Sequence, residues 1–348
     1  MTGPSFSRRA VLTSAGVAAI GLAVGDVQAT PVETPTPQPH LPASILLRSK
    51  LSDDRVKDLR ALSTQLTIGP DIPLADATVV FGGINADELA SAKKLRWVQC
   101  PSAGVEHYPL AAMGEREVML TNGQGCYAPE IAEHAFGLLF ALTRGIATHA
   151  RQNKWGYDRD PIELRGMTLG LVGLGGIGRE VARRGKAMDM HVIAVDAEPM
   201  YGERFAMVEE VRLVDDGFDD LLKRSDVVIS CAPHTPRTRG MFGAEQFAMM
   251  RKGSYFINVS RGKLVKSEAL LGALQSGQLA GAGLDVTDPE PLPEGHPLWS
   301  QANVVVTSHI AGKSQFSYER VQNVFAQNVL RYVKSLPLLN VVDKSKGY

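Results

Sequence analysis

The sequence predicts an α/β protein whose main element is a doubly wound parallel sheet. Short apolar segments that are typical of buried strands alternate with amphipathic segments that suit helices, and this order favours parallel strands. A glycine-rich turn between one such strand and the following helix is the second indication. At 348 residues, the chain is long enough for two domains of ordinary size.

The first 29 residues have the organisation of an export signal. Arg8 and Arg9 precede an uncharged apolar run over 10–25, and a small-residue cleavage site ends at Ala29. Paired arginines are typical of the twin-arginine route, so we expect residues 1–29 to be a cleaved signal and the protein to be periplasmic or secreted. An uncut membrane anchor is the alternative, although the run is shorter than the about 20 residues of a spanning helix.

Folded structure is expected to begin after a proline-rich linker at residues 30–42. Buried strands are predicted at 44–49, 78–83 and 95–104, because these segments are apolar and bounded by turn residues. Charged segments such as DDRVKDLRAL separate them and suit exposed helices. A long helix is predicted from Pro129, since proline suits a first helical turn and the apolar residues after it recur at helical spacing.

The glycine-rich turn has the form GxGxxG, with Gly173, Gly175 and Gly178, and it follows a strand predicted at 168–172. Such glycines allow a tight turn and let a diphosphate approach backbone N–H groups at a helix N-terminus. Asp196 ends the next strand, where a carboxylate can accept hydrogen bonds from ribose hydroxyls and would repel a 2′-phosphate. The motif therefore predicts a dinucleotide site that prefers NAD to NADP.

Further strands are predicted at 225–233, 253–262, 280–286 and 303–312. Chemically capable side chains follow their ends, namely Arg261, Asp285, Glu290 and His309. Each has a simpler explanation alone, as a solvated cap, a turn residue or an ordinary hydrogen-bonding histidine. Because ligands bind at the carboxyl ends of parallel strands, their joint occurrence favours a catalytic site beside the nicotinamide.

Eight segments carry a resemblance to a known family. They are SAGVEHY, APEIAEHAFGLLFALTR, GLVGLGGIG, APHTPRTRGMF, INVSRGKLV, GAGLDVTDPEPLP, HPLW and SHIAG. Through them the chain resembles the D-isomer-specific 2-hydroxyacid dehydrogenases from about Ser44 to the end of the sequence. The resemblance implies a Rossmann-type doubly wound NAD-binding domain at 146–310, inserted into a smaller flavodoxin-like α/β substrate domain at 43–145 and 311–348.

The resemblance also implies an activity, the NAD-dependent interconversion of a 2-keto acid and a D-2-hydroxy acid, as in glyoxylate or hydroxypyruvate reductases. His309 would be the acid/base, Glu290 would orient its ring, and Arg261 would hold the substrate carboxylate and polarise the ketone. Backbone N–H groups of Ala103, Gly104 and Val105 would bind the same carboxylate. The residues expected at the cofactor are Gly173, Gly175, Gly176, Ile177, Gly178, Asp196, Pro233, Thr235, Ser260 and Asp285, with Asp285 on the nicotinamide carboxamide.

Composition excludes other classes of partner. The 37 basic and 37 acidic residues balance and form no basic stripe, which argues against nucleic acid. Cys100, Cys126 and Cys231 lack metal-ligand spacing, so we expect core thiols and no metal, and no further apolar run suggests a membrane partner. A homodimer is implied by the resemblance. Phosphite oxidation and a non-catalytic, NAD-sensing binding protein are the alternative functions.

Overall fold

The computed structural model describes residues 41–348 apart from 154, 157–159 and 199–206. The expected export signal at 1–29 and nearly all of the linker at 30–42 lie outside the described residues. Within the described part of the chain, no helix combines the length and apolar character needed to cross a membrane. Cys100, Cys126 and Cys231 are all free thiols.

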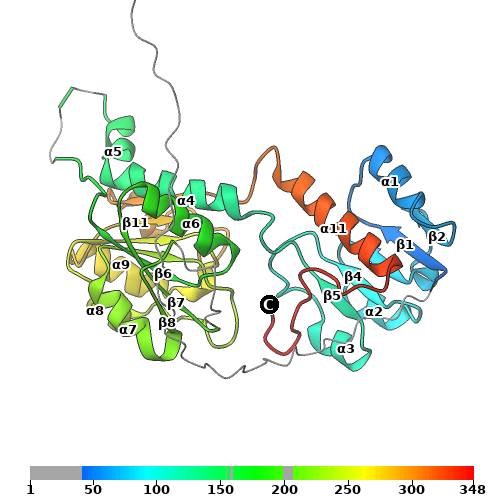
Figure 1. The fold of residues 1–348 in the computed structure, drawn as a ribbon. Coiled ribbons are helices and arrows are strands. Elements are labelled where there is room, and N and C mark those ends of the chain that lie inside the picture. Colours follow the sequence, from blue (N-terminus) through cyan, green and yellow to red (C-terminus); the bar gives the residue numbers. More distant parts are fainter. Residues whose placement is uncertain (1–40, 154, 157–159, 199–206) are drawn as a thin grey trace, which may run out of the picture. The chain divides into compact units, whose positions relative to one another are not determined.

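Five parallel strands form the smaller of two sheets, in the order β2-β1-β3-β4-β5 (Figure 1). The strands are β1 (Ala43–Leu47), β2 (Leu66–Gly69), β3 (Val79–Phe81), β4 (Trp97–Gln99) and β5 (Met119–Thr121). The accompanying helices are α1 (Asp53–Arg60), the 3₁₀ turn η1 (Leu74–Asp76), α2 (Ala86–Ser91), α3 (Leu110–Glu115) and α11 (Ser317–Val333). This strand order is that of flavodoxin-like folds, which confirms the predicted class of the smaller sheet.

Helix α11 returns from the far end of the sequence to cover this sheet. Its Phe325 ring stacks on Phe81 of β3 with 4.1 Å between ring centroids, and Tyr332 lies 5.5 Å from Trp97 of β4. All four rings are fully buried. Aromatic burial of this kind is a large part of what joins two segments that are more than 200 residues apart in the sequence.

A buried network of polar side chains also fixes the orientation of α11 on the sheet. Asn328 of α11 donates from Nδ2 to Oε1 of Gln99 at 2.9 Å, and the Thr121 hydroxyl donates to the same oxygen at 2.8 Å. Asn328 Oδ1 also accepts from the backbone N–H of Leu339 at 2.7 Å. Because a buried polar group without a partner is costly, these bonds specify how α11 and the residues after it lie on the sheet.

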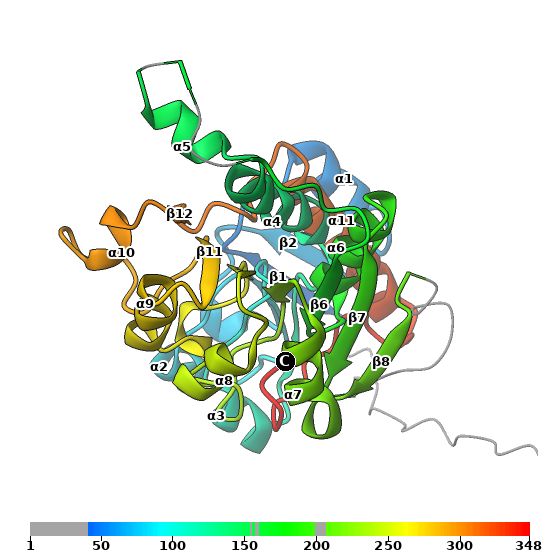
Figure 2. The ribbon, with the colours of Figure 1, turned by 90° about the vertical axis from the view of Figure 1, so that its left-hand side faces the viewer.

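Seven parallel strands form the larger sheet, in the order β12-β11-β10-β9-β6-β7-β8 (Figures 1 and 2). The strands are β6 (Thr168–Val172), β7 (His191–Asp196), β8 (Glu210–Leu213), β9 (Val227–Ser230), β10 (Ser254–Asn258), β11 (Leu279–Leu284) and β12 (Val304–Val306). The helices are α4 (Ala128–Thr143), α5 (Ile146–Arg151), α6 (Gly176–Ala187), α7 (Val214–Arg224), α8 (Ala244–Met249), η3 (Gly262–Leu264), α9 (Ser267–Gln275) and α10 (Pro297–Ser300). The order reverses at β6, as expected for the Rossmann-type doubly wound sheet, and this confirms the predicted fold class.

Helix α4 packs on the larger sheet, whereas the expected boundary after residue 145 had placed it in the smaller domain. Figures 1 and 2 both show α4 beside α6, and its buried leucines join the core under β6, β9 and β10. Glycines of β11 make the close approach possible. A Cβ on Gly283 would lie 2.8 Å from Cβ of Leu138, and one on Gly281 would lie 3.2 Å from Cδ2 of Leu142. Helical periodicity alone does not show which sheet receives the apolar face.

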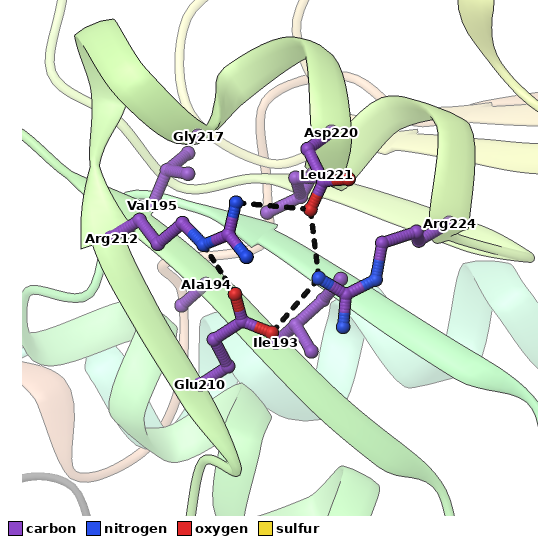
Figure 3. Close-up of a pocket in the computed structure, with 9 residues that line it drawn as sticks. All are labelled: Ile193, Ala194, Val195, Glu210, Arg212, Gly217, Asp220, Leu221 and Arg224. Carbon is purple, nitrogen blue, oxygen red and sulfur yellow. Dashed lines mark hydrogen bonds and ion pairs between the residues drawn. The ribbon is translucent and has the colours of Figure 1, made fainter.

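The sequence did not predict β8, an edge strand with charged side chains. Ion pairs connect this strand to α7 (Figure 3). Arg212 of β8 and Arg224 of α7 each pair with both Glu210 of β8 and Asp220 of α7, so the four side chains form a closed ring. The cavity bounded by this ring has a volume of about 10 Å³, which is room for a single water molecule. It is therefore part of the scaffold and too small for a substrate or cofactor.

Candidate active site

The carboxyl ends of the strands in the larger sheet are aligned along one edge, because the strands are parallel and in register. The register pairs Val195 with Val172, Val172 with Ser230, Ser230 with Asn258, Asn258 with Leu284 and Leu284 with Val306. Predicted site residues follow within a few positions of these strand ends. The sheet therefore brings the glycine turn, Asp196, Arg261, Asp285 and His309 to a common edge.

Each glycine of the turn is needed for a different structural reason. Gly173 has a φ of +99°, and a Cβ there would lie 2.9 Å from the backbone N of Ala232. A Cβ on Gly178 would lie 2.2 Å from the carbonyl oxygen of Gly173, so glycine lets α6 pack against the turn. Gly175 instead faces open space, with no atom within 4 Å of its Cβ position. These are the three roles expected of a turn that receives a diphosphate: tight turn, close packing and free approach.

The first turn of α6 supplies the donors for such an anion. Gly175 is the N-cap and has no capping side chain, and the first backbone bond of the helix runs from Arg179 N–H to the Gly175 carbonyl. The first N–H groups of α6 therefore have no acceptor within the helix and lie at the positive end of its dipole. They belong to Gly176, Ile177 and Gly178. The residues present fit a dinucleotide diphosphate.

Asp196 is held at the turn. Its Oδ2 accepts from the backbone N–H of Leu174 at 2.7 Å, and its Oδ1 accepts from the N–H of Glu198 at 2.9 Å. The carboxylate is thus fixed beside the glycines and keeps lone pairs for further hydrogen bonds. Its predicted contact with the adenosine ribose is compatible with this position.

The remaining predicted cofactor residues lie after β9 and β10. Thr235 donates its N–H to Oγ1 of Thr238, whose hydroxyl lies 2.7 Å from the Pro233 carbonyl oxygen. These bonds form a closed turn. Ser260 is buried, and its hydroxyl lies within 2.9 Å of Ser230 and Asn258 oxygens. The Ser260 side chain therefore links two strand ends, and its contact with the cofactor stays a prediction.

His309 and Glu290 form the predicted pair. Nδ1 of His309 lies 2.6 Å from Oε1 of Glu290, and both side chains are nearly half exposed. A carboxylate accepts a hydrogen bond, so Nδ1 carries a proton toward Glu290. Nε2 is then the ring nitrogen free to exchange a proton with a substrate oxygen.

A buried carboxylate holds the His309 loop in place. His309 has a φ of +51°, a left-handed conformation that costs an L-residue about 1–2 kcal/mol. Asp285, which is 2% exposed, accepts from the N–H groups of Ile310 and Ala311 at 3.0 Å each and from the Thr307 hydroxyl at 2.6 Å. These bonds offset the cost of the loop conformation. Asp285 was predicted to bind the nicotinamide carboxamide; in this structure its oxygens bind the loop, and the carboxamide contact stays a prediction.

His134 of α4 was missed as a member of this network. Its Nε2 lies 2.8 Å from Oγ1 of Thr307 and 3.4 Å from Oδ1 of Asp285. Because the Thr307 hydroxyl proton is directed at Asp285, Nε2 of His134 is the donor to Thr307. The residue stands within the EHAFG stretch of the helix, and only the packing of α4 on the sheet relates it to a loop more than 170 residues later.

Arg261 joins the larger sheet to the loop that was predicted to bind the substrate carboxylate. Its Nε donates to Oε1 of Glu106 at 2.6 Å and its Nη1 donates to the Ser260 carbonyl at 2.8 Å. Nη2 lies 1.9 Å from the position a Cβ on Gly104 would take, so a larger residue there would displace the guanidinium from this position. Nε and Nη1 are thus bonded to other groups of the protein, and Nη2 faces the loop that contains Gly104.

Glu106 was also missed. Partial burial disfavours its charge, yet the hydrogen bond and the positive charge of Arg261 hold the pKa of Glu106 below its ordinary value. The carboxylate is therefore ionised at neutral pH. It lies one residue beyond the predicted loop, and its side chain could be related to Arg261 only by the tertiary structure.

The loop itself presents free donors. Among the described residues, no protein acceptor lies within hydrogen-bonding distance of the N–H groups of Ala103, Gly104 and Val105. The loop is held from behind, since the Ser102 hydroxyl donates to the Gly104 carbonyl at 2.8 Å and Asn122 Nδ2 donates to the Ala103 carbonyl at 2.7 Å. Convergent N–H groups beside a guanidinium are suited to a carboxylate.

Comparison with known proteins identifies the chain's relatives. The family description "D-isomer specific 2-hydroxyacid dehydrogenase, NAD binding domain" matches residues 136–311. The chain belongs to this family. Its NAD-binding domain and the fit of the glycine turn together identify the cofactor as a nicotinamide dinucleotide.

Two relatives of this chain illustrate the range of the family. A glyoxylate reductase of Korarchaeum cryptofilum is 33% identical over 303 residues, which are 85% of this chain and 86% of the relative. A D-3-phosphoglycerate dehydrogenase of Archaeoglobus fulgidus is 36% identical over 279 residues, 78% of this chain. The chain spans about half of the Archaeoglobus protein, 52% of its length.

A solved structure supports the fold independently. The D-isomer specific 2-hydroxyacid dehydrogenase of Xanthobacter autotrophicus Py2, in complex with NADPH and MES, superposes with a TM-score of 0.75 at 27% identity. The match covers 88% of this chain and 99% of that one. Both sheets of this chain therefore belong to the shared fold.

Proposed function

We propose that this protein is an NAD-dependent dehydrogenase that interconverts a 2-keto acid and a D-2-hydroxy acid. The observation that carries the proposal is the placing of a carboxylate-backed imidazole and a guanidinium at the carboxyl ends of β12 and β10. One strand separates them, so the strand ends lie about 10 Å apart. This spacing leaves room for a small keto acid between the two groups.

Different residues of the chain bind the substrate and transfer the proton. The N–H groups of Ala103, Gly104 and Val105 and the free Nη2 edge of Arg261 bind the substrate carboxylate, and Arg261 polarises the ketone. His309 donates its Nε2 proton to the oxygen as negative charge develops there, while Glu290 keeps the ring oriented through Nδ1. NADH supplies the hydride when it is bound. In the direction of oxidation, Nε2 accepts the hydroxyl proton.

We propose NAD rather than NADP as the preferred cofactor. The fixed carboxylate of Asp196, followed by Glu198, would repel a 2′-phosphate at the position where the ribose is expected. The Xanthobacter relative was solved with NADPH, so the family accommodates both cofactors. The local charge of this chain supports the NAD assignment.

The substrate class is tested by following NADH oxidation with glyoxylate, hydroxypyruvate, pyruvate and phenylpyruvate. We expect reduction of the small acids first, because relatives named glyoxylate reductase and glycerate dehydrogenase match most of the chain. Phosphite and the corresponding hydroxy acids are offered with NAD in parallel. If the protein binds NADH but turns over none of these compounds, the enzyme proposal fails and the NAD-sensing function replaces it.

We also propose that the protein is exported with NAD already bound. The paired arginines of the expected signal support a route for folded proteins, and free NAD is not expected outside the cytoplasm. Periplasmic protein isolated without added nucleotide should therefore contain NAD in nearly equimolar amount. Nucleotide-free periplasmic protein, or protein that stays in the cytoplasm, would contradict this proposal without affecting the catalytic one.

A further inference from the structure

A cavity of about 650 Å³ lies on the smaller sheet, between α1 and the carboxyl ends of β1 and β2. Figure 1 shows α1 beside β2, the edge strand of this sheet. The volume is within the range of about 300–1,000 Å³ of sites for small molecules. Residues 47–51, one face of α1, and Gly69 and Pro70 form the walls, and none of them belongs to the proposed substrate or cofactor sites.

The face of α1 in this cavity is set by helical spacing. Asp53, Val56, Lys57 and Arg60 are three, four and seven residues apart along the helix, so their side chains share one side of it. The last of them is held in place, because Nη2 of Arg60 donates to the Ile68 carbonyl of β2 at 2.5 Å. The helix thus presents two cations to the cavity in a defined arrangement.

The loop after β1 forms a second rigid wall. The backbone N–H of Ser49 donates to the Phe81 carbonyl of β3 at 2.9 Å, and the Tyr318 hydroxyl of α11 donates to the Lys50 carbonyl. The loop is therefore bonded to two neighbouring elements of the fold. Its side chains line the cavity without having to order the backbone when a ligand binds.

The lining has an excess of positive charge. Its charged residues are Arg48, Lys50, Asp53, Lys57 and Arg60. Arg48 is paired with Glu88 at 2.8 Å, so its charge is balanced within the protein. The three remaining cations share the cavity with one carboxylate, which leaves an excess of two positive charges.

Hydrogen-bond donors in the cavity are also free. Within residues 41–348, apart from the undescribed positions, no partner contacts the Nζ atoms of Lys50 and Lys57 or the hydroxyl of Ser49. Apolar side chains lie beside these donors. Leu51 is 8% exposed, and Leu47 and Val56 are partly buried against the same core cluster. The cavity therefore combines unpaired cationic donors with an apolar surface.

We propose that this cavity binds the phosphate monoester of a small organic molecule. A phosphate monoester carries about 1.5 to 2 negative charges at pH 7 and has three acceptor oxygens, which matches the excess charge and the free donors of Ser49, Lys50 and Lys57. The organic group covers the apolar surface of Leu47 and Val56. The proposal goes beyond the dehydrogenase function and does not depend on which keto acid is reduced.

Phenyl phosphate is the probe, and its binding to the full-length protein is measured by calorimetry in saturating NADH. The NADH keeps the probe out of the dinucleotide site. We expect one equivalent to bind, and we expect Lys50→Glu and Lys57→Glu each to weaken binding about tenfold, since each replaces a donor with a repelling charge. Both lysines are exposed and unpaired, so both variants should bind NADH normally.

Lys93→Glu is the matched control. Lys93 is exposed, belongs to the domain of the smaller sheet, lies outside the cavity lining, and has no ion pair among the described residues. The variant makes the same charge change and should bind phenyl phosphate normally. Equal losses in Lys93→Glu and Lys57→Glu would overturn the proposal, and so would the absence of binding to the unchanged protein.

Two simpler anions test the ligand class. Benzoate keeps the ring but carries one charge, and inorganic phosphate keeps the charge but lacks the apolar group, so we expect both to bind at least about tenfold more weakly than phenyl phosphate. Benzoate that binds as tightly as phenyl phosphate would overturn the choice of a phosphate. Inorganic phosphate that binds as tightly would overturn the role of the apolar surface.

Discussion

Replacing His309 with glutamine is expected to lower kcat by about 100-fold or more while NADH binding changes by less than about twofold. Glutamine can still accept or donate one hydrogen bond, but it cannot deliver a proton to the developing alkoxide. The glycine turn and the first turn of α6 are untouched, so the cofactor should bind normally. Steady-state kinetics with the best keto acid and NADH titration by fluorescence provide the two measurements.

His191→Gln is the matched control for this change. His191 is another exposed imidazole beside a carboxylate, 3.8 Å from Glu209, but it stands at the start of β7, at the opposite end of the strand from the site. We expect it to keep full activity. Loss of NADH binding together with turnover in His309→Gln would show that the residue supports the fold of the cofactor site and is not the proton donor.

Replacing Arg261 with lysine is expected to lower kcat/KM by about 100-fold or more, mainly through a higher KM. Nε and Nη1 of the guanidinium are bonded to Glu106 and Ser260, and Nη2 faces Gly104. A lysine ammonium lacks this planar arrangement and cannot bond to both protein partners while presenting a donor to the substrate carboxylate. Kinetics across a range of keto-acid concentrations separate the KM and kcat components.

Two further variants show whether geometry or charge is responsible. Glu106→Gln keeps the side-chain oxygen that accepts from Nε but removes its charge, so we expect a much smaller loss than in Arg261→Lys. Arg251→Lys makes the same exchange at an ion pair with Asp226, in the loop before β10, and should leave kcat/KM unchanged. An Arg261→Lys enzyme with near-normal KM would show that the guanidinium does not bind the substrate carboxylate.

Local patterns were sufficient to predict the glycine turn and the elements on either side of it. The glycine turn, the α6 N-terminus and Asp196 occupy consecutive strand, turn, helix and strand positions, and their spacing is set by the repeat of one βαβ unit. Strand ends were also predictable, because apolar runs such as those before Arg261 and His309 stop where polar residues begin. Strands β2, β5 and β8 were not predicted, and β8 carries charged side chains at an edge of the sheet.

The sequence by itself determined the fold class, the glycine turn and the types of side chain that follow the strand ends, because each depends on residues that are close together along the chain. Only the tertiary structure decided that Glu106 anchors Arg261, that His134 and Asp285 hold the His309 loop, and that residues 343–348 approach Asp196. These contacts join segments that are separated by 25 to 173 residues. The physical reason is that sheet register and core packing, and not local propensity, determine which distant side chains come within hydrogen-bonding distance.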